Sequence, residues 1–195
     1  MKKQLAQFIL LGLLSVGVFS CKKEYDDKSL SPLQDSVAEI PITVPNQEFF
    51  ERFPIVTASV SKKDAAGNTG PFTIILQIPS DKGKIKEISR ITTGTAGLAN
   101  MTGAESLSYN YDVTGKKLVP IPGNGTNQIT FTSSLSQYTT YRTRVGAAAA
   151  GQPAVVAPTA AFNAQNPNQL PFYFLITLED GRQLVSTAVR VRVVD

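Results

Sequence analysis

The chain has 195 residues, of which 42% are hydrophobic and 17% charged, and its formal net charge at neutral pH is +4. It contains no histidine, which removes the commonest general base, the usual zinc and copper ligand, and every Ser-His-Asp or Cys-His arrangement. Its single cysteine excludes an internal disulfide framework, a CxxC redox motif and a thiolate zinc site.

The first twenty residues have the pattern of an export signal. Lys2 and Lys3 supply positive charge, and the stretch from Phe8 to Phe19 is apolar apart from Ser15. About a dozen apolar residues suit the core of a signal peptide, whereas a membrane-spanning helix needs about 20. We therefore expect residues 1–20 to be a signal peptide that is removed on export.

This segment ends in Val18-Phe19-Ser20-Cys21, which resembles the lipobox of bacterial lipoproteins. Phe19 is bulkier than the small residue usual at its place. The resemblance implies that Cys21 carries a diacylglycerol, that cleavage falls just before it, and that its new amine is acylated, with palmitate as the expected chain. At about 0.8 kcal/mol per buried methylene, two or three chains hold a protein to a membrane effectively permanently. The alternative is an ordinary signal peptide followed by an incidental cysteine, and the lack of a second cysteine disfavours it.

Residues 21–51 are predicted to form a flexible polar tether, because prolines interrupt the segment and it has no sustained periodicity. Its start, CKKEYDD from Cys21 to Asp27, resembles the lysine-plus-acidic tag of Bacteroidota lipoproteins that are exported to the outer face of the outer membrane. Charged residues are also common in disordered tethers without any such role. Further along, Asp35-Ser36-Val37 matches the O-glycosylation acceptor motif of the same phylum, which makes Ser36 the candidate acceptor.

Strand-like patterns begin in the predicted domain, residues 52–195. Ile55–Ser61 and Phe72–Ile78 alternate as strands do, and a turn rich in Gly, Asn and Asp separates them. In Ile85–Thr92 the isoleucines recur at every third residue, which fits a helix better than a regular strand. The flanking turns leave little room for a helix, so a strand with a bulge is the favoured interpretation.

The middle of the domain is less regular. Residues 94–128 are rich in Gly, Asn and Thr, with short strands predicted at Ser106–Tyr111 and Lys117–Ile121. A further strand is predicted at Ile129–Ser133, where alternation returns.

A helix and a long loop follow. Ser134 and Gln137 have the spacing of a capping box, which predicts a short helix over residues 135–144. Residues 146–170 form a loop of Ala, Pro and Asn, and loops of such length are often functional or else mobile.

The end of the chain carries the strongest hairpin pattern. Pro171–Leu178 and Gln183–Val194 are predicted strands on either side of a tight turn. The Asp180-Gly181 pair in that turn favours a type I′ conformation. Valines alternate with arginines in the last strand, so we expect one face of the strand to be buried and the other to be exposed to solvent.

Together, roughly six to eight short strands separated by turns predict an all-β fold, an immunoglobulin-like β-sandwich with one short helix and long loops. The cysteine and tryptophan core of true immunoglobulin domains is absent. In outline the domain resembles the wider fibronectin-type-III or bacterial immunoglobulin-like group. The ending FYFLITLEDGRQLVS…VRVRVV resembles the final hairpin of such domains in short Bacteroidota outer-membrane lipoproteins.

Few residue patterns could carry chemistry. The carboxylate pairs Asp26-Asp27 and Glu179-Asp180 lie in the tether and in a turn, where a solvated structural role is favoured over acid–base catalysis. Asp81 and Glu87 lack the alternate carboxylates of a calcium loop. Lysines and arginines are scattered, without the basic run or aromatic stripe of a nucleic-acid site. We expect no metal, no cofactor, no nucleic-acid partner and no enzymatic activity.

The candidate binding aromatics are Tyr109, Tyr111, Tyr138 and Tyr141. Sugar-binding surfaces rely on large exposed aromatic side chains, and in a chain without tryptophan these tyrosines would have to supply them. Packing within the sandwich is the favoured alternative role for all four.

The leading hypothesis is a lipoprotein of the outer membrane, lipid-anchored and exposed at the cell surface, that acts as a non-enzymatic binding or accessory module. The periplasmic face is the alternative location. Domains of this kind in the lipoproteins that it resembles often serve glycan capture, so the expected partners are an outer-membrane protein complex or a polysaccharide. A second hypothesis is a structural adhesin or fimbrial-type subunit that assembles by strand addition, for which the long closing strand would supply an edge. A small hydrolase is disfavoured by the lack of histidine.

Overall fold

The computed structural model describes residues 39–50, 52–94, 96–146, 155–161 and 168–195. All of them except Glu39 belong to one compact unit, Ile40–Asp195. The predicted signal peptide, Cys21 and Ser36 lie outside the described residues. Within the described part of the chain, no helix is long and apolar enough to cross a membrane.

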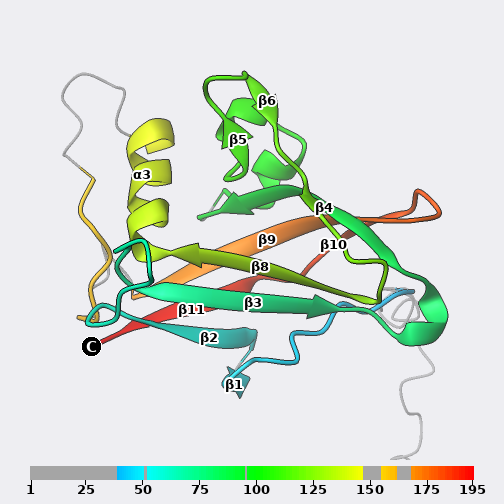
Figure 1. Ribbon diagram of the computed structural model, residues 1–195, viewed down its shortest axis with the longest axis horizontal. Helices are drawn as coiled ribbons and strands as arrows, with labels where there is room; N and C mark the ends of the chain where they lie inside the picture. The colour runs from blue at the N-terminus through cyan, green and yellow to red at the C-terminus, as the bar shows by residue number, and fades with distance from the viewer. Residues whose placement is uncertain (1–38, 51, 95, 147–154, 162–167) are drawn as a thin grey trace, which may run out of the picture. The chain divides into compact units, whose positions relative to one another are not determined.

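Two β-sheets face each other in this unit (Figure 1). The larger sheet contains β1 (Phe49–Phe50), β2 (Pro54–Ser59), β4 (Ile85–Thr93), β7 (Ile121–Pro122), β9 (Gln169–Leu178), β10 (Gln183–Val185) and β11 (Val189–Val194). Its strand order is β1-β2-β11-β9-β4-β7, and β10 also pairs with β9. The smaller sheet contains β3 (Pro71–Gln77) and β8 (Gln128–Ser134). The helix α3 (Leu135–Gly146) follows β8 directly.

The strand order is that of an immunoglobulin-like sandwich. β4, β9 and β11 form an antiparallel group like strands C, F and G of immunoglobulin domains, and β3 and β8 take the places of strands B and E. β2 runs parallel to β11 at the side of the larger sheet. The prediction of an all-β sandwich with one short helix is confirmed.

Alternating side chains from both sheets fill the space between them. β3 buries Phe72 and every second residue after it, and β9 does the same from Leu170 to Leu178. The ring of Phe131 in β8 lies 5.8 Å from that of Phe172 and 5.4 Å from that of Phe174, centroid to centroid. Aromatic contacts therefore join the two sheets at the centre of the core.

β4 is a bulged strand, as predicted. Its register with β9 shifts between Ile85 and Glu87 and again between Ile88 and Arg90. Each irregularity adds one residue to the two-residue repeat of a strand, so inward-facing positions recur at every third residue. Ile85, Ile88 and Ile91 are all fully buried as a result.

The closing strand differs from its prediction. The predicted strand Gln183–Val194 is divided into β10 and β11, because four steps separate Val185 from Val189 while three separate their partners on β9. Ser186 bridges the break. Its Oγ accepts the Phe174 N–H at 3.0 Å, and its own N–H donates to the Phe174 carbonyl at 2.9 Å.

The turn before this strand is a three-residue loop, so the type I′ prediction is wrong. Gly181 has a φ of +88°, whereas Asp180 keeps a negative φ. The Gly181 N–H donates to the Leu178 carbonyl at 3.0 Å, and the Leu178 N–H donates to the Arg182 carbonyl at 2.9 Å. This is the pattern of a type I turn followed by a glycine bulge.

Part of the segment that the sequence assigned to the tether packs on the domain. Ile40 and Val44 are buried members of the core. Thr43 exchanges two main-chain hydrogen bonds with Gln77 at the end of β3, at 2.8 and 2.9 Å. The compact unit therefore begins at Ile40 and not at residue 52.

Candidate functional site

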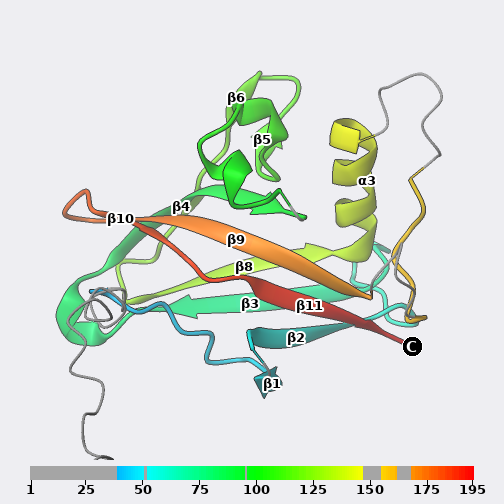
Figure 2. The same ribbon diagram turned by 180° about the vertical axis from the view of Figure 1, so that it is seen from behind.

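An insertion between β4 and β7 stands on one side of the sandwich. It includes β5 (Tyr111–Asp112) and β6 (Lys117–Leu118), which pair as a short hairpin. The strand predicted at Ser106–Tyr111 is wrong except at its last residue, because a 3-10 turn occupies Glu105–Leu107 and β5 begins only at Tyr111. The strand predicted at Lys117–Ile121 is present as two short pieces, β6 and the first residue of β7. Figures 1 and 2 both show the insertion and α3 rising from the same side of the sandwich.

Arg90 holds the start of the insertion against β4. Its side chain is buried, and Nη1 donates to the carbonyls of Asn100, Met101 and Gly103 at 3.3, 2.6 and 3.0 Å. A buried cation is costly unless it is hydrogen-bonded, and these three carbonyls supply that compensation.

Asn110 fastens the far end of the insertion. Its Oδ1 accepts the Ile91 N–H at 2.9 Å, and its Nδ2 donates to the carbonyls of Ser89 and Val119 at 3.2 and 2.9 Å. One side chain thus bridges β4 and the segment that follows β6.

The helix α3 stands opposite the insertion on the same side of the sandwich (Figures 1 and 2). Ser134 caps it by accepting the Gln137 N–H at 3.1 Å, as predicted, and the helix runs two residues beyond the predicted end. The Gln137 side chain does not complete the capping box, because its Oε1 accepts from Ser133 Oγ at 2.9 Å. The buried face of the helix consists of Leu135, Tyr138 and Tyr141.

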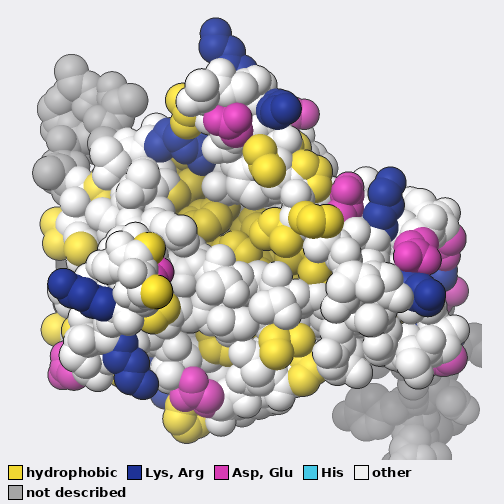
Figure 3. Space-filling view, viewed as in Figure 1, with side chains coloured by type: hydrophobic (Ala, Val, Ile, Leu, Met, Phe, Trp, Pro, Cys, Tyr) yellow, Lys and Arg dark blue, Asp and Glu magenta, His cyan; other side chains and the backbone are white. Residues whose placement is uncertain are grey.

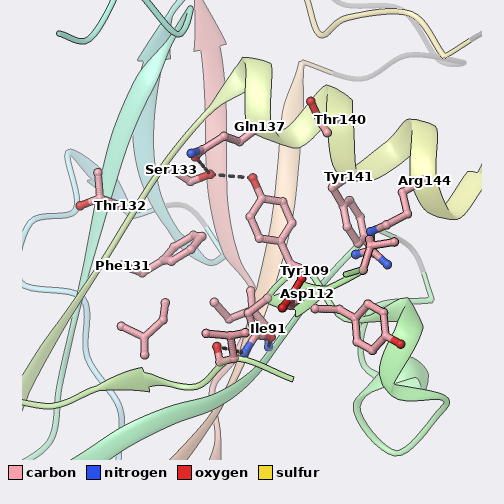
Figure 4. Close-up of a pocket in the computed structure, with 15 residues that line it drawn as sticks. Ile91, Tyr109, Asp112, Phe131, Thr132, Ser133, Gln137, Thr140, Tyr141 and Arg144 are labelled. Atoms are coloured by element: carbon pink, nitrogen blue, oxygen red, sulfur yellow. Dashed lines mark hydrogen bonds between the residues drawn. The ribbon is translucent and has the colours of Figure 1, made fainter. Parts of the chain in front are cut away.

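Between α3 and the insertion lies a groove with a volume of about 540 Å³. We name it the tyrosine groove, and its lining includes Tyr109, Tyr111, Phe131, Thr132, Tyr141 and Arg144. Apolar side chains gather in the hollow below the insertion (Figure 3), and Figure 4 shows the residues that line it. The volume lies within the range of known ligand pockets.

Three of the four candidate tyrosines line the groove, and the ring of the fourth, Tyr138, lies 6.4 Å from that of Tyr141 without lining it. Tyr109, Tyr111 and Tyr141 line the groove, and the rings of Tyr109 and Tyr141 lie 5.0 Å apart. Tyr138 is a buried core residue whose ring lies 6.0 Å from that of Phe172. For Tyr138, the packing alternative is the one that the structure shows.

Tyr109 connects the groove to the core. Its ring packs edge-on against Phe131 and Phe172 at 5.9 and 5.4 Å, and its hydroxyl lies 2.6 Å from Ser133 Oγ. Burial raises the pKa of Tyr109 to about 12, although the hydrogen bond with Ser133 lowers it. Burial likewise raises the pKa of Tyr141, with Arg144 acting in the opposite direction. Both phenols therefore remain protonated at neutral pH.

Arg144 closes the groove between the helix and the insertion. Its guanidinium donates to the carbonyls of Ser106 and Ser108, the latter at 2.6 Å. The same group lies over the rings of Tyr111 and Tyr141, at 5.5 and 5.3 Å from their centroids. Arg144 therefore links α3 to the insertion, and its guanidinium already contacts residues of both.

The described residues contain no cluster of three or more His, Cys, Asp or Glu side chains that could hold a metal ion. Asp180 of the carboxylate pair in the closing turn forms an ion pair with Arg182 at 2.7 Å. In the groove, Asp112 accepts the Thr114 N–H at 2.9 Å.

A second hollow, of about 1040 Å³, lies between α3 and residues 157–161. Its lining consists mainly of small threonine, alanine and proline side chains, without an aromatic residue. We therefore regard the tyrosine groove as the better candidate, since aromatic side chains dominate binding energetics.

No protein-family model matches this chain, and no curated protein matches its sequence. The groove is therefore interpreted from its own residues. Sequence analysis missed Arg144 and Asn110, because neither belongs to a motif. The only available signal was the spacing of three between Tyr138, Tyr141 and Arg144, which places them on adjacent turns of the helix.

Proposed function

We propose that this protein is a surface lipoprotein, anchored in the outer membrane by lipid on Cys21, whose domain is a non-enzymatic binding or accessory module. The tyrosine groove is its ligand site. The observation that carries this proposal is an open groove of about 540 Å³ with aromatic and aliphatic walls, whose charged side chains Asp112 and Arg144 are held by contacts within the domain. A pre-formed, mostly apolar hollow with a few fixed polar groups is the usual form of a binding site.

Glycan capture is the first version of this function to test. The probe is a panel of purified polysaccharides, and the protein is the mature chain carrying Cys21→Ser so that it stays soluble without lipid. Tyr111 lines the groove from the insertion and is only partly buried, so Tyr111→Ala removes a ring that a sugar could contact. We expect this variant to weaken binding about tenfold, from the loss of one aromatic contact.

Phe49→Ala is the matched control, because Phe49 is an aromatic residue 48% exposed in β1, outside the groove. Its binding should equal that of the parent chain. Equal losses in both variants would place the glycan elsewhere, and no binding across the panel would remove the glycan version.

Assembly by strand addition remains the second candidate, but on a different strand. The closing strand β11 pairs with β2 on one side and with β9 on the other, so it offers no edge. The observation that favours strand addition is instead the outer edge of β8, since β8 pairs with β3 alone among the described strands. Its simplest test is the oligomeric state of the mature chain, since a fimbrial-type subunit would self-associate.

A further inference from the structure

The two strands of the smaller sheet have different outer edges. The outer edge of β3 is covered by the segment before β1. Asn46 Nδ2 donates to the Thr73 carbonyl at 2.8 Å, and Asn46 Oδ1 accepts the Ile75 N–H at 2.9 Å. Thr43 forms two main-chain hydrogen bonds with Gln77 along the same edge of β3. The main-chain groups of residues 73, 75 and 77 therefore point away from β8.

This fixes which groups of β8 point outward. In an antiparallel pair, successive residues face the partner and the outer edge alternately. Since residues 73, 75 and 77 face outward on β3, their register partners Thr132, Thr130 and Gln128 face outward on β8. Thr126 Oγ1 satisfies both main-chain groups of Gln128, at 3.1 Å each.

The outward main-chain N–H and C=O groups of Thr130 and Thr132 have no hydrogen-bond partner among the described residues. Both residues are exposed, and among the described residues β8 pairs with β3 alone. Immunoglobulin sandwiches carry a further strand at this position, beside strand E. No described strand of this chain occupies that place.

The open edge borders the tyrosine groove. Thr132 and the neighbouring Phe131 both line the groove, and Figure 4 shows them on its β8 side. A strand added beside β8 would place every second side chain toward the apolar wall of the groove and the others toward solvent.

The groove matches an uncharged, apolar segment. Its two charged lining residues, Asp112 and Arg144, are engaged inside the domain. The chain's own tether does not fit, because residues 22–39 carry eight charged side chains and their few large aliphatic residues do not alternate. The tether is therefore not the segment that the groove takes.

We infer that the tyrosine groove takes an extended segment of a partner protein, apolar at every second residue, which adds to β8 as a strand and hydrogen-bonds to the main chain of Thr130 and Thr132. This inference rests on the proposed function and assigns the ligand of the groove to a class. The main-chain bonds give affinity, and the groove wall selects the side chains.

The probe is a displayed library of random twelve-residue peptides, selected on the mature chain carrying Cys21→Ser. A selected peptide is then measured against Thr132→Pro and Thr132→Val. Proline removes the outward N–H, and edge strands tolerate it where that N–H faces solvent. Valine keeps the N–H and changes only the side chain. We expect Thr132→Pro to weaken binding at least about tenfold, and Thr132→Val, which keeps the main-chain N–H, to weaken it much less than Thr132→Pro does.

Amide hydrogen exchange on the parent chain gives a second readout that does not depend on the proline variant folding. The amides of Thr130 and Thr132 should exchange more slowly when peptide is bound. The Ile75 amide, already bonded to Asn46, should not change.

The outcomes separate this inference from the proposed function. Peptide binding that survives Thr132→Pro, or that leaves both threonine amides unprotected, overturns strand addition while the groove stands as a binding site. If no peptide is selected and a polysaccharide binds through Tyr111, the inference fails and the proposed function holds. If neither peptide nor polysaccharide binds, both fail. Concentration-dependent self-association through Thr132 would identify the occupant as a second copy and contradict a separate partner.

Discussion

At the scale of single residues, Tyr109 links three parts of the domain. Its main-chain N–H donates to the Ile91 carbonyl of β4 at 2.7 Å, its hydroxyl contacts Ser133 of β8, and its ring packs against Phe172 of β9. The same residue lines the tyrosine groove. A change at Tyr109 should therefore alter both the stability of the domain and the shape of the groove.

Tyr109→Phe tests this through pH. The folded-state pKa of Tyr109 is raised from 10.0 to about 12, so the folded state keeps a proton that the unfolded state loses in this interval. The stability contributed by burying the neutral phenol is complete below pH 10 and is lost as pH rises toward 12. The resulting fall in the free energy of unfolding is on the order of 1 to 2 kcal/mol.

Urea unfolding at about pH 9 and about pH 11.5 measures this fall in the parent and in Tyr109→Phe. All other titratable groups are common to the two proteins, so the difference between them isolates the phenol. The variant should show the smaller fall. An equal fall in both proteins would mean that the Tyr109 hydroxyl is not protected by burial.

At the scale of elements, the sequence predicted the strands well wherever apolar residues recur with the same period as the buried positions. The strands with regular alternation were predicted closely, and even the bulged β4 could be recognised because turns on both sides excluded a helix. The insertion could not be predicted, because it is held by side chains such as Arg90 and Asn110 that bond to main-chain carbonyls and amides. Such contacts leave no repeating pattern in a sequence.

The groove was less predictable than the fold for a related reason. Its lining comes from β4, the insertion, β8 and α3, which are joined only by the folded structure. Three of its tyrosines were identified as candidates by residue type. Tyr138 and Tyr141 both lie on the buried face of α3, and only the folded structure shows that Tyr141 lines the groove while Tyr138 does not.

Gly70 provides a test of how α3 is seated on the sandwich. Its φ is +62°, and a Cβ placed there would lie 2.5 Å from Cγ and Cδ1 of Leu135, the first residue of the helix. Its carbonyl also accepts the Leu135 N–H at 3.0 Å. Gly70→Ala should therefore lower the free energy of unfolding by about 2 to 3 kcal/mol, through backbone strain and displacement of the helix start.

Gly125→Ala is the matched control, because Gly125 also has a positive φ, +76°, but has no atom within 4 Å of the added Cβ. It should cost only about 1 kcal/mol, the price of the backbone conformation alone. Chemical denaturation of both variants measures the difference. Equal losses would show that the contact with Leu135 relaxes without consequence.

At the scale of the whole molecule, the proposal combines an anchor with a binding domain. The lipobox-like ending at Cys21 precedes Ile40, the first residue of the compact unit, by 19 positions. Lipid on Cys21 would hold the domain at a membrane, and a partner segment in the tyrosine groove would then be gathered beside that membrane. In this proposal, the function of the domain in the cell would depend on Cys21, although Cys21 is not part of the groove.

Cys21→Ser tests the proposed anchor when the protein is expressed in a bacterium that processes lipoproteins. Loss of the thiol removes the site for diacylglycerol, so we expect no incorporation of a palmitate analogue and loss of the protein from the membrane pellet. A single acyl chain gives only marginal membrane binding, at an association constant of about 10⁴ M⁻¹, so stable retention of the parent requires at least two chains. Ser20→Ala is the control, because it keeps a small residue before the cleavage site and leaves the thiol in place.

External protease applied to intact cells then distinguishes the faces of the membrane. The parent should be digested if the domain is at the surface and protected if it faces the periplasm. A Cys21→Ser protein that stays in the membrane with the extraction behaviour of the parent would show that lipid on this residue is not what holds it there.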